Sequence, residues 1–255
     1  METKHFKVDQ LTVKVYDSRE DMGRYAANEI AGAIIGLLSK KEEINMIFAA
    51  APSQNEVLEA LVSNKGIDFS RINAFHMDEY IGLPKDAPQG FGNFLCEHLF
   101  NQCNFKSVHL INGLAEDIDA ECQRYGDLLT QNRADIVCMG IGENGHIAFN
   151  DPSVADFHDS KMIKEVTLEE KCRNQQVHDG CFDKLSEVPK KALTLTVPAL
   201  MNADYHFCIV PAKTKAQAVY DTVNGPVSEK CPASILRHAK SSILYLDADS
   251  SNLLK

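Results

Sequence analysis

The segment of residues 135–152 limits the fold of this chain more than any other segment does. Residues 136–139 form an apolar run without a polar break, which is typical of a central parallel strand covered on both faces. A glycine-rich turn follows and leads to His146. Because ligands bind beyond the carboxyl ends of strands in open α/β sheets, this turn predicts that His146 lies at a ligand site. Histidine titrates near neutral pH, which suits it to proton transfer.

The same turn also spells G-x-G-x-x-G, the pattern of dinucleotide-binding folds, from Gly140 to Gly145. In those folds the pattern belongs to the first βαβ unit and opens directly into a helix. Here it lies past the middle of the chain, and the Asn-Asp-Pro sequence at residues 150–152 soon stops any helix. The sequence therefore disfavours nicotinamide binding.

Strand-like and helix-like patterns alternate along the chain. The strand-like segments are residues 11–16, 44–51, 72–77, 136–139, 192–197, 205–210 and 242–246. The helix-like segments are residues 18–37, which Ser18 caps, and residues 57–61, 94–100, 117–129 and 214–222. This alternation predicts an α/β fold with a mostly parallel, Rossmann-like sheet and helices on both faces. We expect a single domain over residues 1–255, because no linker or repeat divides the chain.

Composition excludes several classes of partner. The formal net charge is -10 and no basic tract is present, so we expect no nucleic-acid or anionic-membrane partner. The apolar run at residues 30–38 is too short to span a bilayer, and the first ten residues lack a signal core. The eight cysteines show no zinc spacing, and Cys138 and Cys208 lie in apolar runs. These features predict a cytoplasmic protein with reduced cysteines.

Three further strand ends carry polar residues that can meet His146 at one edge of the sheet. The first carries Ser53 and Gln54 after the strand at residues 44–51. The free N–H groups of a helix start there would attract phosphate. Ser53 and Glu56 also have the spacing of an ordinary capping box, and Glu56 would repel an anion. Both interpretations of this segment stay open.

The second strand end carries the adjacent carboxylates Asp78 and Glu79. One of them can be a general base at the rim of the sheet, or both can be solvated loop carboxylates. His76 lies nearby, but no complementary ligand cluster accompanies it, so we interpret it as structural and expect no metal site.

The third strand end carries Lys213 and Lys215 at the start of a helix. Cations at a helix N-terminus oppose the helix dipole, and a bound phosphate would offset that penalty. The alternative is that both lysines face solvent. A lone histidine such as His146 can likewise be structural, but its glycine-rich setting favours a catalytic role.

Together these segments resemble the glucosamine-6-phosphate deaminase (isomerase) family. The motifs that carry the resemblance are Phe75-His-Met-Asp-Glu-Tyr-Ile-Gly-Leu-Pro, Gly140-Ile-Gly-Glu-Asn-Gly-His-Ile-Ala-Phe-Asn-Asp-Pro, Val188-Pro-Lys-Lys-Ala-Leu-Thr-Leu-Thr and the lysine segment ending at Lys215-Ala. Their order and spacing cover nearly the whole chain. The related sugar-lactonase family shares the fold and the Gly-His turn. Its acidic motif looks like Asp-Glu-Arg, whereas this chain has Asp-Glu-Tyr at residues 78–80.

The resemblance implies an enzyme that acts on a small amino-sugar phosphate, either glucosamine 6-phosphate or galactosamine 6-phosphate. His146 would open the sugar ring, and Asp78 would move a proton from C2 to C1 before ammonia is lost. Asn144 and Asp151 would complete the catalytic group. The resemblance implies no metal and no redox cofactor, and it allows a homo-oligomer.

The resemblance also assigns binding roles. Lys215 corresponds to the family's phosphate-binding lysine, and Ser53 and Gln54 fall in its phosphate loop. Arg173 is the arginine of this chain that lies nearest to the position of the family's phosphate-binding arginine. Further residues belong to the loops around the substrate, namely Gly142, Gly145 and Glu79.

Several positions depart from the family pattern. Asn144 stands where many members have aspartate, and Asp151 is shorter than the usual glutamate. Residues 51–53 replace a glycine pair, and Gln176 occupies the place of the phosphate-gripping arginine. These departures leave two alternatives open besides a deaminase. One is a 6-phosphogluconolactone hydrolase in which His146 activates water, and the other is a sugar-phosphate sensor without catalytic activity.

Overall fold

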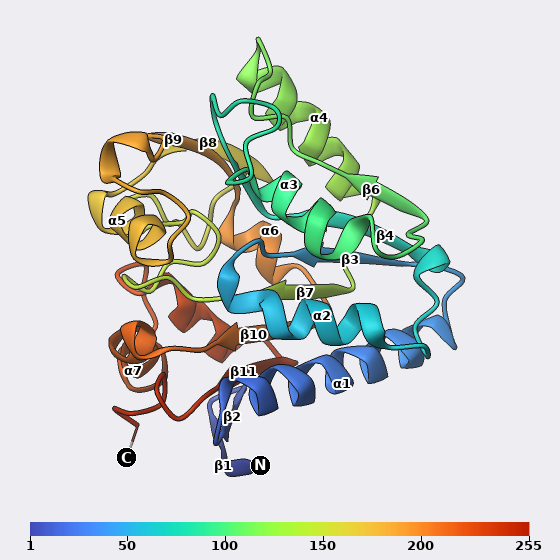
Figure 1. Ribbon diagram of the computed structural model, residues 1–255, viewed down its shortest axis with the longest axis vertical. Coiled ribbons are helices and arrows are strands. Elements are labelled where there is room, and N and C mark those ends of the chain that lie inside the picture. Colours follow the sequence, from blue (N-terminus) through green and yellow to red (C-terminus); the bar gives the residue numbers. More distant parts are fainter. Residues whose placement is uncertain (255) are drawn as a thin grey trace.

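Eight strands form one sheet in the computed structural model, which describes residues 1–254 (Figure 1). Their order is β1-β2-β11-β10-β7-β3-β4-β6. The bounds are β1 Glu2–Val8, β2 Leu11–Tyr16, β3 Ile44–Phe48, β4 Ile72–His76, β6 Ser107–His109, β7 Ile136–Met139, β10 Tyr205–Val210 and β11 Ser242–Leu246. Neighbouring strands pair in parallel except β1 and β2, which form an antiparallel hairpin at one edge.

Helices cover both faces of this sheet. Their bounds are α1 Arg19–Leu38, α2 Asn55–Ser63, α3 Phe91–Leu95, α4 Ile118–Gln131, α5 Glu170–His178, α6 Val197–Met201 and α7 Ala216–Asn224. In β7, Ile136 and Cys138 pack in the core cluster of α1, α2 and α3, whereas Val137 and Met139 pack in the cluster of α4, α6 and α7. A strand with apolar side chains on both faces requires this arrangement. The predicted α/β fold class is confirmed.

The first helix shows how local sequence sets an element. The Ser18 hydroxyl accepts a hydrogen bond from the backbone N–H of Asp21 at 3.1 Å, as the predicted cap requires. Met22, Ala26 and Ile30 then recur at helical spacing and are fully buried against the sheet. Helix α1 therefore begins directly after β2, and its first residue is Arg19.

Two predicted elements differ from those observed. Residues 192–197 were expected to join the main sheet, but β9 (Lys191–Leu195) lies in a separate antiparallel sheet between β5 (Asp78–Tyr80) and β8 (Ile163–Thr167). A buried apolar run has the same pattern in either sheet, so pattern alone cannot assign it. The helix expected at residues 94–100 begins at Phe91, and its last part, Cys96–Phe100, is a π-helix.

Several observed elements were not predicted, among them β1 and α5. Strand β1 is mostly exposed, because it is an edge strand that pairs only with β2. Helix α5 is mainly polar, and it buries Cys172, Gln175 and Gln176 rather than an apolar stripe. Neither element has the apolar periodicity by which helices and strands are detected in a sequence.

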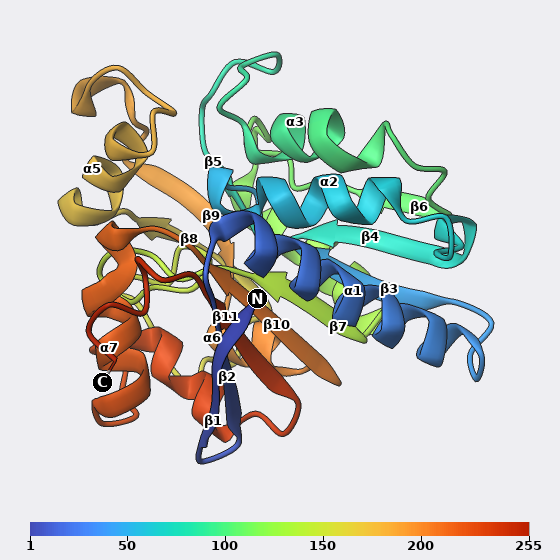
Figure 2. The ribbon, with the colours of Figure 1, turned by 60° about the horizontal axis from the view of Figure 1, so that its bottom comes forward.

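The strand order reverses next to β3. From β3 the chain continues outward to β4 and β6, whereas β7 lies on the other side of β3 and leads to β10 and β11. The carboxyl ends of β3 and β7 are therefore neighbours at the point where ligands bind in open α/β sheets. Figures 1 and 2 show α5 and α7 at this end of the sheet. Within residues 1–254, every helix is too short or too polar to span a bilayer.

Candidate active site

A cavity opens at the carboxyl ends of β3, β4, β7 and β10. Loops from all four strands line it, together with the first residue of α1 and one side of α5. The lining residues that carry polar side chains are Arg19, Ser53, Gln54, Asp78, His146, Gln175, Gln176, Asp179, Thr214 and Lys215. The strand ends that were expected to meet His146 at one edge of the sheet therefore line one cavity.

The glycine-rich turn after β7 presents the His146 side chain to this cavity. Gly145 adopts a positive φ of 84°, and its N–H donates to the Gly142 carbonyl at 2.9 Å. A Cβ atom on Gly142 would lie 2.1–2.4 Å from ring atoms of His146, so the imidazole fills the space that a side chain would need. After the turn, the Asn150 N–H donates to the Ile147 carbonyl and no helix starts. This geometry agrees with the exclusion of a dinucleotide fingerprint.

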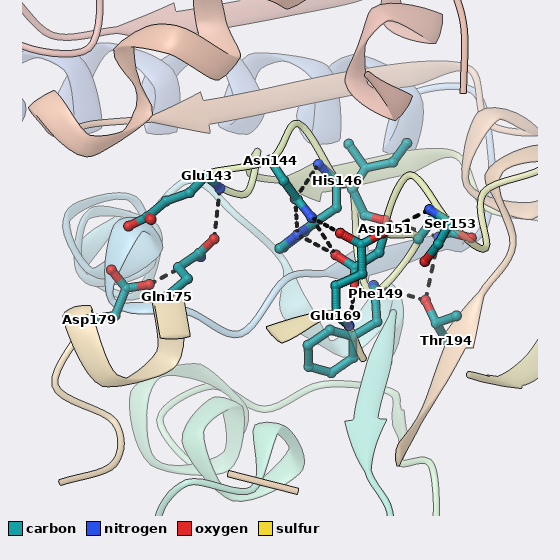
Figure 3. A network of polar contacts seen from close by, with 12 residues as sticks. Glu143, Asn144, His146, Phe149, Asp151, Ser153, Glu169, Gln175, Asp179 and Thr194 are labelled. Carbon is teal, nitrogen blue, oxygen red and sulfur yellow. Dashed lines mark hydrogen bonds and ion pairs between the residues drawn. The ribbon is translucent and has the colours of Figure 1, made fainter. Parts of the chain in front are cut away.

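Two polar side chains contact the imidazole from behind (Figure 3). The Nδ1 atom of His146 lies 2.7 Å from Oδ1 of Asn144 and 3.1 Å from Oδ1 of Asp151. Burial raises the pKa of Asp151, but hydrogen bonds from His146 and Asn144 outweigh burial and leave it below its usual value. A charged carboxylate therefore lies beside Nδ1. With Nδ1 engaged, Nε2 is the nitrogen available to a ligand.

A second acidic residue, Glu169, holds Asp151 in place. The backbone N–H of Glu169 donates to Oδ2 of Asp151 at 2.9 Å, and its carboxylate accepts from Asn144 at 3.3 Å and from the Ser153 N–H at 2.9 Å. The sequence analysis missed Glu169 because it immediately precedes α5, a helix that no apolar pattern marks.

The adjacent carboxylates Asp78 and Glu79 have different surroundings. Both are buried, so the interpretation as solvated loop residues is wrong. Asp78 lines the cavity, and burial, followed by the nearby charge of Glu79, raises its pKa well above the usual carboxyl value. Glu79 points elsewhere, because neighbouring residues of a strand face opposite sides.

Glu79 is a structural anchor in this arrangement. Its carboxylate accepts backbone hydrogen bonds from Tyr80 at 2.9 Å, Phe91 at 3.0 Å and Gly92 at 2.8 Å, and it thereby holds the start of α3. Burial raises the pKa of Glu79, although these donors oppose the shift. The structure therefore does not bring Glu79 to the cavity as a substrate-loop residue.

The predicted phosphate-binding residues Ser53, Gln54 and Lys215 all line the cavity. Ser53 does not cap a helix as a capping box would require. Its hydroxyl accepts from Nε2 of Gln54 at 3.1 Å, and Gln54 also donates to the Ile209 carbonyl at 3.2 Å, which ties this loop to β10.

The two lysines after β10 differ in exposure. Lys215 is only 5% exposed and faces the cavity, whereas Lys213 is exposed to solvent. Burial lowers the pKa of Lys215, and the charges of Asp179 and Glu143 oppose that shift. The alternative of two solvent-facing lysines therefore describes Lys213 only.

The structure does not bring Arg173 to the cavity. Its guanidinium donates to the carbonyls of Leu185 at 2.7 Å and Val188 at 2.8 Å, so it fastens the loop that follows α5. Gln176 lines the cavity instead. The sequence-based assignment of Arg173 to phosphate is wrong in position, because Arg173 does not line the cavity and its Nε and Nη2 atoms donate to backbone carbonyls.

Arg19 lines the cavity and was missed in the sequence. Its Nε donates to Glu56 at 2.6 Å, so Glu56 pairs with an arginine instead of facing an anion. The rule that ligands bind at carboxyl ends of strands would have found Arg19, since it is the first helical residue after β2.

His76 is structural, as predicted. It is fully buried, its Nε2 accepts the Ile111 N–H at 2.8 Å, and burial lowers its pKa to about 3. Within residues 1–254, one group has the donor types and spacing to hold a metal, namely His146, Asp151 and Cys172, whose ligand atoms lie within 4.8 Å of one another. The eight cysteines are all free, and Cys138 and Cys208 are buried.

Comparison with known proteins identifies the family. Residues 17–245 match the family described as glucosamine-6-phosphate isomerases/6-phosphogluconolactonase. The chain belongs to this family. A glucosamine-6-phosphate deaminase of Streptococcus sanguinis is 33% identical over 233 residues, which cover 89% of this chain and 97% of that protein. A glucosamine-6-phosphate deaminase of Lactobacillus delbrueckii subsp. bulgaricus is 34% identical over 90% of this chain and 97% of its own length.

Two solved structures share the fold of this chain. A monomeric glucosamine-6-phosphate deaminase superposes with a TM-score of 0.86 at 28% identity, covering 94% of this chain and 99% of that chain. A 6-phosphogluconolactonase from Thermotoga maritima superposes with a TM-score of 0.75 at 19% identity, covering 93% and 99% of the two chains. The second likeness shows the fold alone, so the choice between the two activities depends on the site.

Proposed function

We propose that this chain converts an amino-hexose 6-phosphate and water into a ketohexose 6-phosphate and ammonia. Glucosamine 6-phosphate, which would give fructose 6-phosphate, is the first candidate substrate. One observation carries the proposal: Asp78, His146 and Lys215 line the same cavity, with Asp151 directly behind the imidazole. That set provides a base, a proton shuttle and a phosphate-binding cation in one place. Relatives named glucosamine-6-phosphate deaminase, a third identical to this chain, support it.

His146 would open the pyranose ring. Asn144 and Asp151 engage Nδ1, so Nε2 can donate a proton to the ring oxygen and accept the proton of the C1 hydroxyl. The charged carboxylate of Asp151 stabilises the imidazolium form that this shuttle requires. An aldehyde at C1 then makes the C2 proton acidic enough to remove.

Asp78 would move the C2 proton. A carboxylate with a raised pKa is a stronger base than a solvated one, and burial gives Asp78 that property. The abstracted proton is delivered to C1 while one proton of the C2 amine passes to O1, which leaves an imine at C2. Water adds to that imine, the C2–N bond breaks, and the nitrogen leaves as ammonia.

The substitution at Asn144 is compensated within the site. Asn144 contacts the imidazole through its amide oxygen but brings no charge. Asp151 brings that charge to the same nitrogen, 3.1 Å away. The departures at these two positions therefore keep one carboxylate beside Nδ1, which favours a catalytic site over a sugar-phosphate sensor.

The environment of Tyr80 weighs against a lactone hydrolase. At the position where the lactonase motif has arginine, Tyr80 is buried among Phe91, Phe149 and Phe182, with ring centroids 4.9, 5.3 and 5.7 Å away. An arginine would not fit this aromatic cluster without exposing or pairing its charge.

The direct test measures product release from three compounds in parallel. Purified protein is given glucosamine 6-phosphate, galactosamine 6-phosphate and 6-phosphogluconolactone, and ammonia, ketose phosphate and acid are measured. We expect ammonia and ketose phosphate in equal amounts from an amino sugar. Lactone hydrolysis without ammonia would assign His146 to water activation. Binding of the sugar phosphates without any product would support the sensor.

The eight free cysteines fit the proposal that the reaction occurs in a reducing compartment such as the cytoplasm. A homo-oligomer stays a prediction.

A further inference from the structure

Arg19 lines the cavity but has no role in the proposed reaction. Among the described residues, Arg19 and Lys215 are the lysine and arginine side chains that line the cavity. We propose that Arg19 is the second cation for the substrate phosphate and a determinant of specificity for phosphorylated sugars. This inference rests on the proposed function, because it assigns a role within the same site.

The cavity needs a second cation on grounds of charge. A sugar phosphate carries close to two negative charges near neutral pH. Lys215 carries one positive charge and is influenced by the acidic side chains of Asp179 and Glu143. Gln176, which lines the same cavity, is neutral, and Arg173 is held by backbone carbonyls. Arg19 is therefore the residue that can complete the charge.

Arg19 is fixed in position by two contacts on one side of its guanidinium. Its Nε donates to Glu56 at 2.6 Å, and its Nη2 donates to the Pro52 carbonyl. Guanidinium has five N–H donors, and no residue of the described chain uses those of Nη1. The remaining donors are thus free to bind phosphate oxygens, for which the planar guanidinium is well suited.

The contact with Pro52 places the guanidinium at the proposed phosphate loop. Pro52 and Ser53 belong to the same 3-10 turn after β3, and both line the cavity with Arg19. An anion that binds at Ser53 would therefore lie close to the Arg19 guanidinium, which is hydrogen-bonded to the neighbouring residue, Pro52. The Arg19 side chain is 33% exposed, so its positive charge is only partly removed from water.

Glu56 orients Arg19 without facing the ligand. It does not line the cavity, and its second oxygen is buried without a hydrogen-bond partner among the described residues. Its carboxylate is therefore committed to the arginine. The pair explains why a glutamate that would repel an anion can follow the phosphate loop.

The test measures binding of glucitol 6-phosphate and of unphosphorylated glucitol by calorimetry. Both compounds lack a carbonyl and cannot react, so binding is measured apart from turnover. We expect Arg19→Gln to weaken glucitol 6-phosphate about 10- to 100-fold and to leave glucitol unchanged. Arg24→Gln is the matched control, because Arg24 lies on the same helix, pairs with Asp21 and does not line the cavity. It should change neither affinity.

A second experiment moves the guanidinium to another residue that lines the cavity. Arg19→Gln combined with Gln176→Arg should recover part of the lost affinity for glucitol 6-phosphate. Thermal unfolding of each variant checks that the fold is kept. Equal weakening of both compounds by Arg19→Gln would assign Arg19 to loop structure, and no weakening would remove it from the phosphate site. Either result overturns the inference.

The same measurements separate this inference from the proposed reaction. If no amino-sugar phosphate releases ammonia but Arg19→Gln still weakens glucitol 6-phosphate selectively, the reaction is wrong and the phosphate role of Arg19 stands. If ammonia is released and Arg19→Gln has no selective effect, the reaction stands and the inference falls. Equal affinity of the unaltered protein for both compounds would also refute it.

Discussion

The Nδ1 atom of His146 lies 3.1 Å from a carboxylate oxygen of Asp151. The reversal of the chain between Ile147 and Asn150, with Ala148 at a positive φ of 48°, returns the backbone so that the two side chains meet. Asn144 bridges them by contacting both. A histidine with a buried carboxylate at Nδ1 and an open cavity at Nε2 can accept and release a proton without leaving its position.

Removal of the charge at Asp151 should impair the histidine. We expect Asp151→Asn to lower kcat by about 100-fold, since the imidazolium would lose its counter-charge. Steady-state ammonia release is the measurement. The double variant Asn144→Asp with Asp151→Asn restores one carboxylate beside Nδ1 and should recover part of kcat. Unchanged kcat in the single variant would show that the charge is not needed.

Asp78→Asn should stop the proton transfer while leaving binding largely intact. Exchange of the C2 proton with heavy water, followed by NMR, should fall to background. At pH values where Asp78 is ionised, the same change should raise the free energy of unfolding by about 0.5–2 kcal/mol, because it removes a buried charge next to Glu79. Exchange that persists in the folded variant would assign the base to another residue.

The acidic limb of the pH–rate profile should lie above the usual carboxyl range. Burial and then Glu79 raise the pKa of Asp78, so its basic form appears only as pH rises through that raised pKa. The pKa of Asp78 is higher in the folded protein than in the unfolded chain. Its contribution to the free energy of unfolding is therefore fully present below the pKa of the unfolded chain, and it is lost as pH rises through the pKa of the folded protein. Activity should therefore increase with pH where stability from Asp78 decreases. A limb near pH 4 in kcat/KM would contradict this assignment.

Lys215→Met should raise KM for phosphorylated sugars about 10- to 100-fold and affect unphosphorylated sugars little, since one buried charge-assisted contact is lost. Lys213→Met is the control, because Lys213 is exposed and does not line the cavity. Equal changes for both sugar classes would remove Lys215 from the phosphate site.

Gly142→Ala should abolish activity by displacing the imidazole. The added Cβ would lie 2.1–2.4 Å from ring atoms of His146, which must move. Gly36→Ala is the comparison: this position of α1 has no neighbouring atom within 4 Å of the added Cβ. That change should stabilise the protein by about 0.5–1 kcal/mol and leave kcat unaffected. Full activity in Gly142→Ala would mean that the observed position of His146 is not required.

Much of the fold could be predicted from local patterns. Residues 136–139 predict a central strand because both faces of that strand are apolar, and Ser18 predicts the start of α1 because a hydroxyl there can satisfy a free N–H. The polar helix α5 could not be predicted in this way. Its Gln175 and Gln176 face a cavity rather than an apolar core, so they leave no hydrophobic period.

The sequence by itself determined the α/β class, the strand that delivers His146, and the residue types at four strand ends that the family resemblance links to sugar-phosphate chemistry. Only the tertiary structure decided which of those side chains meet. It turns Asp78 to the cavity and Glu79 to α3, buries Lys215 and exposes Lys213, and brings Arg19 in place of Arg173. The physical reason is that side-chain direction depends on strand pairing and on available backbone partners, and both come from residues distant in the sequence.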